Sequence, residues 1–267
     1  MLTKKIRSAI AIIGVIILGL TASLSQAGPI LIINGSSGTS EPNTTTMITN
    51  NLEALHIAAG NTVTIFDGVP VDLSPFSQVW DIRFSNNLAI TESQESQFLS
   101  YLQSGGGMFV MGENGGFMTR NNSVLGLIDA AGGGLLSYTG SSSAQTVNAP
   151  FGGPNPVTSV NFAAPGGVGG PGIGQCITED DSGRCAGVAF GLGTLNNASN
   201  GALTAIFDVN FMQGSRGVDQ QNLLKNLIGF VGEAVDPPNP NPVPEPSILV
   251  LFVIGLLSLS FRFRRFS

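Results

Sequence analysis

The chain has 267 residues, a formal net charge of −6 and 42% hydrophobic residues, but only 10% charged residues. When both terminal segments are set aside, about 215 residues remain, enough for one domain with its own core. Most acidic residues but few basic ones fall in this body, which argues against nucleic acid or an anionic membrane surface as a partner. The basic residues of the body are Arg83, Arg120, Arg184, Arg216 and Lys225.

The N-terminal segment, residues 1–27, has the three parts of a secretory signal. Lys4, Lys5 and Arg7 precede the apolar run 9–20, and the small residues around Ala27 suit a signal peptidase. The run is shorter than the about 20 residues that a stable membrane helix needs. We therefore predict a signal peptide over residues 1–27 that is cleaved after Ala27.

The C-terminal segment also has three parts. A proline-rich linker, residues 236–246, leads into an apolar run over 248–261 and then a cluster of arginines. By the positive-inside rule these arginines stay in the cytoplasm, so the body lies across the membrane. As a helix the run spans about 21 Å, which suits a short transmembrane helix that is later removed better than a permanent anchor. The arginines are Arg262, Arg264 and Arg265.

The order of these parts resembles the PEP-CTERM sorting signal of Gram-negative bacteria that make extracellular polysaccharide. The resemblance covers residues 243–267 and depends on the arginine cluster and on the motif Val243, Pro244, Glu245 and Pro246. It implies recognition by an exosortase, transient anchoring in the inner membrane, cleavage near the motif and export to the cell surface or matrix. An ordinary C-terminal anchor is the alternative.

The body alternates between predicted strands and helices. Apolar runs rich in β-branched residues predict buried strands, and apolar residues at helical spacing predict the helices between them. This alternation predicts an α/β fold with a doubly wound, mostly parallel, flavodoxin-like sheet. The expected strands are 29–33, 62–66, 78–82, 108–111 and 202–209, and the expected helices are 44–59 with threonine caps, 91–104 with a capping box, 123–131 and 219–231.

An insertion interrupts this alternation over about residues 132–201, where glycine, proline, serine and asparagine dominate. We expect it to be irregular or β-rich, with a flexible loop at 166–174. Cys176 and Cys185 lie in it, and in an oxidising compartment they are expected to form a disulfide. The loop between them holds Glu179, Asp180 and Asp181, which we interpret as a solvated acidic turn because the ligand spacing of an EF-hand is absent. Calcium-dependent adhesion through these acids is a further hypothesis.

The body also resembles the class I glutamine amidotransferase-like fold, on the order of its elements around Gly105–Gly107, Met111–Gly116 and the closing strand and helix. That family has a nucleophile elbow, Gly-x-Cys-x-Gly, where this chain has Gly112-Glu113-Asn114-Gly115-Gly116. The only histidine, His56, is expected half-exposed on the first helix. Since Cys–His chemistry is absent, we expect no enzyme. Nothing in the sequence indicates a cofactor or a metal site.

Polar residues follow several of the predicted parallel strands. In open α/β sheets ligands bind outside the carboxyl ends of the strands, so these residues indicate a site for a small polar or sugar-like ligand. The interpretation that we favour for Glu113 is simpler, a cap of the helix that follows it. The candidate ligand-binding residues are Asn34, Ser36, Asp81, Arg83, Glu113, Asn114 and Asp208.

The sequence thus predicts an exported, non-catalytic protein that serves as a binding or structural component of the cell surface or matrix. Its expected partners are an exosortase, the membrane before processing and extracellular polysaccharide. The alternative is a carboxylate-dependent hydrolase of surface polysaccharide, in which Glu113 acts with Asp81 or Asp208.

Overall fold

The central part of the fold is a parallel sheet of five strands in the order β2-β1-β3-β4-β11. The computed structural model describes residues 28–208 and 210–233. This strand order is the flavodoxin-like one, in which the order reverses between β1 and β3. The strands are β1 (Pro29–Ile33), β2 (Thr62–Phe66), β3 (Gln78–Asp81), β4 (Gly107–Gly112) and β11 (Ala202–Phe207).

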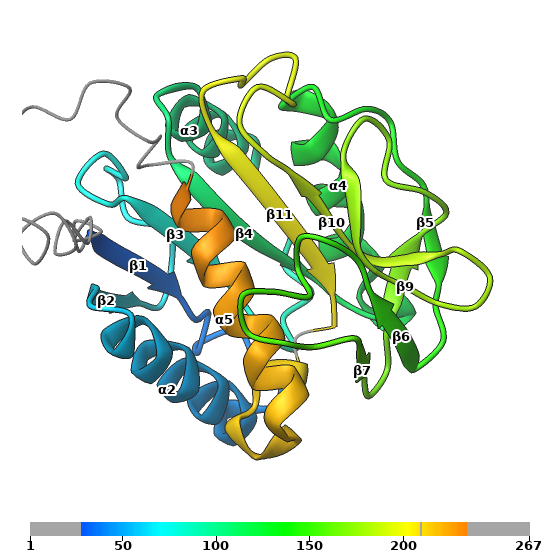
Figure 1. The fold of residues 1–267 in the computed structure, drawn as a ribbon. Helices are drawn as coiled ribbons and strands as arrows, with labels where there is room; N and C mark the ends of the chain where they lie inside the picture. The colour runs from blue at the N-terminus through cyan, green and yellow to red at the C-terminus, as the bar shows by residue number, and fades with distance from the viewer. Residues whose placement is uncertain (1–27, 209, 234–267) are drawn as a thin grey trace, which may run out of the picture. The chain divides into compact units, whose positions relative to one another are not determined.

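Helices cover both faces of this sheet, as Figure 1 shows. One face packs against α2 (Pro42–Ala58) and α5 (Val218–Glu233), and the other against α3 (Glu92–Gln103) and α4 (Met118–Ala130). Alternate residues of each central strand enter one core or the other, as the pleat requires. The prediction of a doubly wound α/β fold is confirmed.

The inserted segment is a β arm that continues the sheet with antiparallel pairing (Figure 1). β10 pairs with β11, β9 with β10, β6 with β9 and β7 with β6, while β8 pairs with β10 and β5 with β8. The β-rich reading of 132–201 was right. The strands are β5 (Tyr138–Gly140), β6 (Ala144–Val147), β7 (Ser159–Asn161), β8 (Gly166–Val168), β9 (Gln175–Glu179) and β10 (Cys185–Phe190).

The flexible loop expected at 166–174 is wrong for its first residues, because β8 is a fully buried strand. Glycine fits there for a steric reason. A Cβ on Gly166 would lie 2.5 Å from the carbonyl oxygen of Glu113, and one on Gly167 would lie 2.6 Å from that of Cys185. The absence of side chains lets this strand approach both neighbours closely.

The helix starts agree only in part with the predictions. The capping box of α3 is confirmed, since Thr91 Oγ1 accepts from Gln94 N at 3.3 Å and Gln94 Oε1 accepts from Thr91 N at 3.2 Å. The expected threonine cap of α2 is wrong. That helix begins at Pro42, whose fixed φ suits a first helical position. α4 begins five residues before the predicted 123, after the short 3-10 turn η1 (Gly115–Phe117).

The predicted signal peptide, linker and sorting signal lie outside the described residues. The described residues belong to one compact unit. Over 28–208 and 210–233, no helix combines the length and apolar character required to cross a membrane.

Candidate functional site

The candidate ligand-binding residues lie along the carboxyl edge of the parallel sheet. Asn34 follows β1, Asp81 ends β3, Glu113 follows β4 and Asp208 follows β11. Because these strands are parallel, their carboxyl ends lie on the same edge. The strand order reverses between β1 and β3, the two strands that carry Asn34 and Asp81. The predicted location at this edge is therefore correct.

The most deeply buried part of this edge is an ion cluster around Asp81. Arg83 Nε donates to Asp81 Oδ1 at 2.7 Å, and Arg83 Nη2 bonds to Asp81 Oδ2. Arg120 Nη2 lies 3.1 Å from the same Oδ2, and Arg120 Nε donates to the carbonyl of Met111 at 2.9 Å. Burial would raise the pKa of Asp81, but the charges of Arg120 and Arg83 together hold it below its ordinary value. Asp81 is therefore ionised, and both of its carboxylate oxygens contact arginine side chains.

Glu113 has a different environment. One carboxylate oxygen accepts from the backbone N–H of Ser85 at 2.8 Å, and the Ser85 hydroxyl donates to Glu41 Oε1 at 3.1 Å. Ser85 has a φ of 51°, which is uncommon for a residue other than glycine. The helix-cap interpretation of Glu113 is wrong, because its carboxylate joins the loop after β4 to the loop after β3, and the Ser85 hydroxyl links that loop to the one before α2. Asn114 is the capping residue instead, accepting from Gly116 N at 2.9 Å.

Glu113 is only 2% exposed, and this burial is the main reason that its pKa is raised to about 7. The hydrogen bond from Ser85 lowers the pKa, the charges of Asp208 and Glu41 raise it, and the charge of Arg120 lowers it. The site therefore holds a carboxyl group that takes up or releases a proton near neutral pH. The attraction of Arg120, which is paired with Asp81, is the smallest of these influences on the pKa of Glu113.

The other predicted residues hold loops in place. Asp208 accepts from the backbone N–H groups of Ala164 at 2.9 Å and Asn210 at 2.8 Å. Asn34 Oδ1 accepts from Ser36 N at 3.1 Å, and the Ser36 hydroxyl donates to Asp67 Oδ1 at 2.8 Å. Ser36 is exposed.

His56 is not half-exposed as predicted but completely buried. It belongs to the face of α2 that packs on the sheet, and its ring contacts that of Trp80 edge-on, with centroids 5.1 Å apart. Burial lowers the pKa of His56 to about 3, so the ring is neutral at physiological pH. It is a core residue of the first helix.

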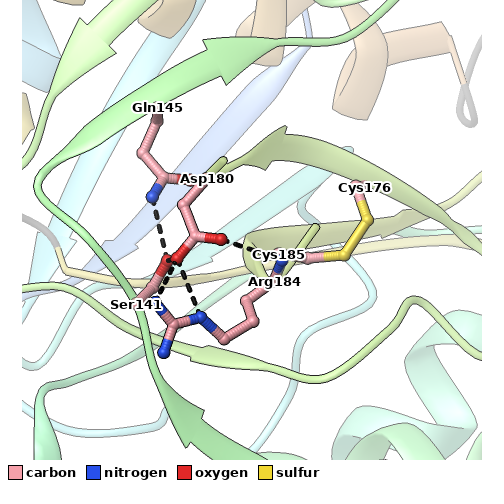
Figure 2. The surroundings of a disulfide bond; sticks show 6 residues. All are labelled: Ser141, Gln145, Cys176, Asp180, Arg184 and Cys185. Carbon is pink, nitrogen blue, oxygen red and sulfur yellow. Dashed lines mark hydrogen bonds and ion pairs between the residues drawn. A yellow bond between two sulfur atoms is a disulfide. The ribbon is translucent and has the colours of Figure 1, made fainter. Parts of the chain in front are cut away.

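The expected disulfide joins Cys176 and Cys185, with Cα atoms 5.3 Å apart (Figure 2). The prediction of a solvated acidic turn in the loop that it closes is wrong for Asp180, which is buried, whereas Glu179 is half-buried and Asp181 is exposed. Figure 2 shows the Asp180 carboxylate among Ser141, Arg184 and the backbone of the loop. It accepts from Arg184 Nε at 2.9 Å and from Ser142 N at 3.0 Å. Burial would raise the pKa of Asp180, but these hydrogen bonds lower it well below its ordinary value.

Sequence reasoning missed three residues of the site: Arg120, Ser85 and Glu41. Arg120 had a signal, because it shares a helical face with the buried residues Val124 and Ile128, where an unpaired cation would be costly. Ser85 and Glu41 lie in loops, and nothing in their local sequence indicates their contacts.

Among the described residues, no group of three or more His, Cys, Asp or Glu side chains is placed to hold a metal ion. A hollow of about 250 Å³ lies beside α3, away from the carboxyl edge. It shares no residue with the candidate site. Its lining residues are Val71, Asp72, Leu73, Ser74, Gln97, Ser100, Tyr101 and Ser104.

Two comparisons bear on identity. The PEP-CTERM protein-sorting motif matches residues 242–265, which include the sorting residues predicted from the sequence. This motif indicates an exported protein that an exosortase processes. No curated protein sequence matches the chain.

Two solved structures have a similar fold. The mmIFT52 N-terminal domain superposes with a TM-score of 0.54 at 10% identity, over 76% of this chain and 97% of its own. The exo-beta-1,4-mannosidase Op5Man5 from Opitutaceae bacterium strain TAV5 superposes with a TM-score of 0.51 at 12% identity, over 77% of this chain. This chain spans only 36% of the mannosidase. At such identities the likeness is one of fold alone.

Proposed function

We propose that this protein is a non-catalytic binding or structural component of the bacterial cell surface or extracellular matrix. The observation that carries the proposal is the sorting motif at residues 242–265, which marks the chain for export and processing. After cleavage near Pro244-Glu245-Pro246, the α/β domain is released from the membrane. Extracellular polysaccharide is the partner that this destination favours.

The chemistry of the carboxyl edge supports binding over catalysis. A glycosidase of the usual kind needs two carboxyl groups that are free to exchange protons or attack. Asp81 is held by two arginines, and both oxygens of Asp208 accept backbone N–H groups. Neither of the partners that the sequence suggested for Glu113 is free.

The test of export is the intact mass of the protein from the surface and medium fractions of its host. We expect a chain that begins at Gly28 and ends near Pro244-Glu245-Pro246, with both thiols unreactive until reduction. Replacing Arg262, Arg264 and Arg265 by serine should leave the full-length tail in the membrane, whereas lysine at the same positions should preserve processing. Full-length protein found only in membranes of the unaltered host would reject the proposal.

One observation favours the hydrolase as a second candidate. Glu113, with its pKa of about 7, shares Ser85 as a hydrogen-bond donor with Glu41, so two carboxylates stand on either side of one residue. A protonated Glu113 would be the general acid and Glu41 the second carboxylate.

This candidate is tested by measuring reducing ends released from the polysaccharide of the host. A hydrolase would lose turnover in both Glu113→Gln and Glu41→Gln while remaining folded. Asp72→Asn, at an exposed acid beside α3, is the matched control. Our proposal expects no release by any of these proteins, and release that depends on Glu113 would replace it with the hydrolase.

A further inference from the structure

The two ends of the sheet are protected very differently. At one end, β7 is three residues long, and Gln220 of α5 donates to the carbonyl of its last residue, Asn161, at 3.4 Å. At the other end, β2 is five residues long and, within the part of the chain that the structure describes, pairs only with β1. Short or covered edges resist further pairing, and long bare ones invite it.

The sequence of β2 lacks the features that usually prevent an edge strand from pairing with another chain. This strand, Thr62-Val-Thr-Ile-Phe66, contains no charged residue and no proline, and its register with β1 has no bulge. Ile65 is 37% exposed and Phe66 is 47% exposed. Natural edge strands carry lysine, proline or bulges to prevent pairing with another chain.

The backbone of β2 presents its unpaired groups in a definite pattern. Asn34 N donates to the carbonyl of Phe66 at 2.9 Å, so the polar backbone groups of Phe66 face β1. Since backbone groups alternate along a strand, the N–H and C=O groups of Val63 and Ile65 face outward. An added strand would therefore bond to these two residues.

We propose that the occupant of this edge is β2 of a second copy of the chain, in antiparallel pairing centred on Thr64. In this register Val63 of each copy lies opposite Ile65 of the other, and the outward groups of both bond reciprocally. Thr62 lies opposite Phe66, a β-branched and aromatic pair that favours sheets. No like charges meet, because the strand has none.

The expected dimer has two-fold symmetry and a continuous sheet through both copies. An antiparallel pair of five-residue strands buries less than the about 1,200 Å² of a stable interface, so the dimer should be weak and concentration-dependent.

Cysteine cross-linking tests the register. The test uses residues 28–235, whose two cores lie within the described residues. The native cysteines are already paired, so Thr64→Cys supplies a single free thiol at the two-fold axis. Opposite residues of this kind have Cα atoms about 4.5 Å apart, within the range of a disulfide. Thr62→Cys is the matched control, because its copies would lie about 13 Å apart along the strands.

We expect mild oxidation to cross-link Thr64→Cys at least about tenfold more than Thr62→Cys. Equal cross-linking of both variants, or of neither, would overturn the proposed register.

Sedimentation measurements over a range of concentrations test the surface itself. Ile65→Pro removes an outward N–H without removing a bond to β1, and should abolish the dimer while the domain stays folded. Val71→Lys, at a 99% exposed position outside the strand, is the control and should leave the dimer intact. A chain that is monomeric throughout, or a dimer that survives Ile65→Pro, would contradict the proposal. So would a monomer whose retention in the matrix depends on Ile65, which would assign the edge to a different protein.

Discussion

Asp81 and Glu113 are both buried carboxyl residues at the carboxyl edge of the same sheet, yet their surroundings differ. Asp81 lies between two arginine side chains, whereas Glu113 is held by a single backbone N–H and has two other carboxylates nearby. Opposite charges lower the pKa of Asp81, and burial raises that of Glu113. The comparison separates a carboxylate that holds the fold together from one whose charge the fold tolerates poorly.

A third acid, Asp180, resembles Asp81 although it lies in the β arm. Its carboxylate accepts from Arg184 and from backbone N–H groups of its own loop and of Ser142. Both residues are compensated, one by ion pairs in the core and one mainly by hydrogen bonds beside a disulfide. Glu113 is the one of the three that lacks such compensation.

The largest expected effect is that of Asp81→Asn. It leaves Arg83 and Arg120 buried without their counter-charge, and breaking a buried ion pair in this way costs about 3–5 kcal/mol of unfolding free energy. Urea unfolding at pH 7 measures the loss. Asp72→Asn, at an exposed acid, is the control and should change stability by less than about 0.5 kcal/mol.

The ion-cluster interpretation can be sharpened by also replacing Arg120. In Asp81→Asn, Arg83 and Arg120 are buried cations without a counter-charge. Adding Arg120→Met removes one of them, so the double variant should be more stable than Asp81→Asn alone. If the two losses simply add, the proposed coupling between Asp81 and Arg120 is absent.

Glu113→Gln should raise the free energy of unfolding above neutral pH, whereas Asp81→Asn lowers it. The folded pKa of about 7 lies above the ordinary 4.5, so the stability contributed by this group is complete below about pH 4.5 and is lost as pH rises through about 7. Glutamine keeps an acceptor for Ser85 N–H but carries no charge. The stability of the variant relative to the natural protein should therefore rise by about 2–3 kcal/mol between pH 5 and pH 8.

Urea unfolding at half-unit steps between pH 5 and pH 8 measures this difference. Asp129→Asn, at an exposed acid on α4, provides the control. A difference between Glu113→Gln and the natural protein that stays constant with pH would show that Glu113 does not titrate in this range.

The sequence was sufficient to predict most of the central sheet because β1, β3, β4 and β11 are almost completely buried and therefore appear as largely apolar runs. The positions of Asn34, Glu113 and Asp208 at one edge followed from strand direction alone. Their bonding did not, since Ser85 reaches Glu113 and Glu41 across more than 25 positions of the chain. Contacts of this kind depend on tertiary packing and leave no periodic pattern.

Two errors have local physical causes. The first concerns His56, which was expected to be half-exposed but lies with Thr45 and Thr49 on the buried face of α2. Threonines tolerate this burial because their hydroxyls donate to carbonyls one turn earlier, as Thr49 does to Thr45 at 2.8 Å. The strand β8 was missed because glycines, which normally indicate loops, serve there to admit neighbouring backbone.

The smallest of these effects is expected for Asp180→Asn, which keeps one acceptor but loses the charge that strengthens the bonds from Arg184 and the backbone. Since Arg184 is 37% exposed, the cost should be about 1–2 kcal/mol. The folded pKa of Asp180 lies below its ordinary 3.8, so its stabilisation is present above that pH and is lost as pH falls through the folded value. The variant and the natural protein should therefore converge in acid, the reverse of the behaviour expected for Glu113→Gln. Because the disulfide closes the same loop, reducing it should lower the measured cost of Asp180→Asn, and equal costs in both redox states would show that the two constraints act independently.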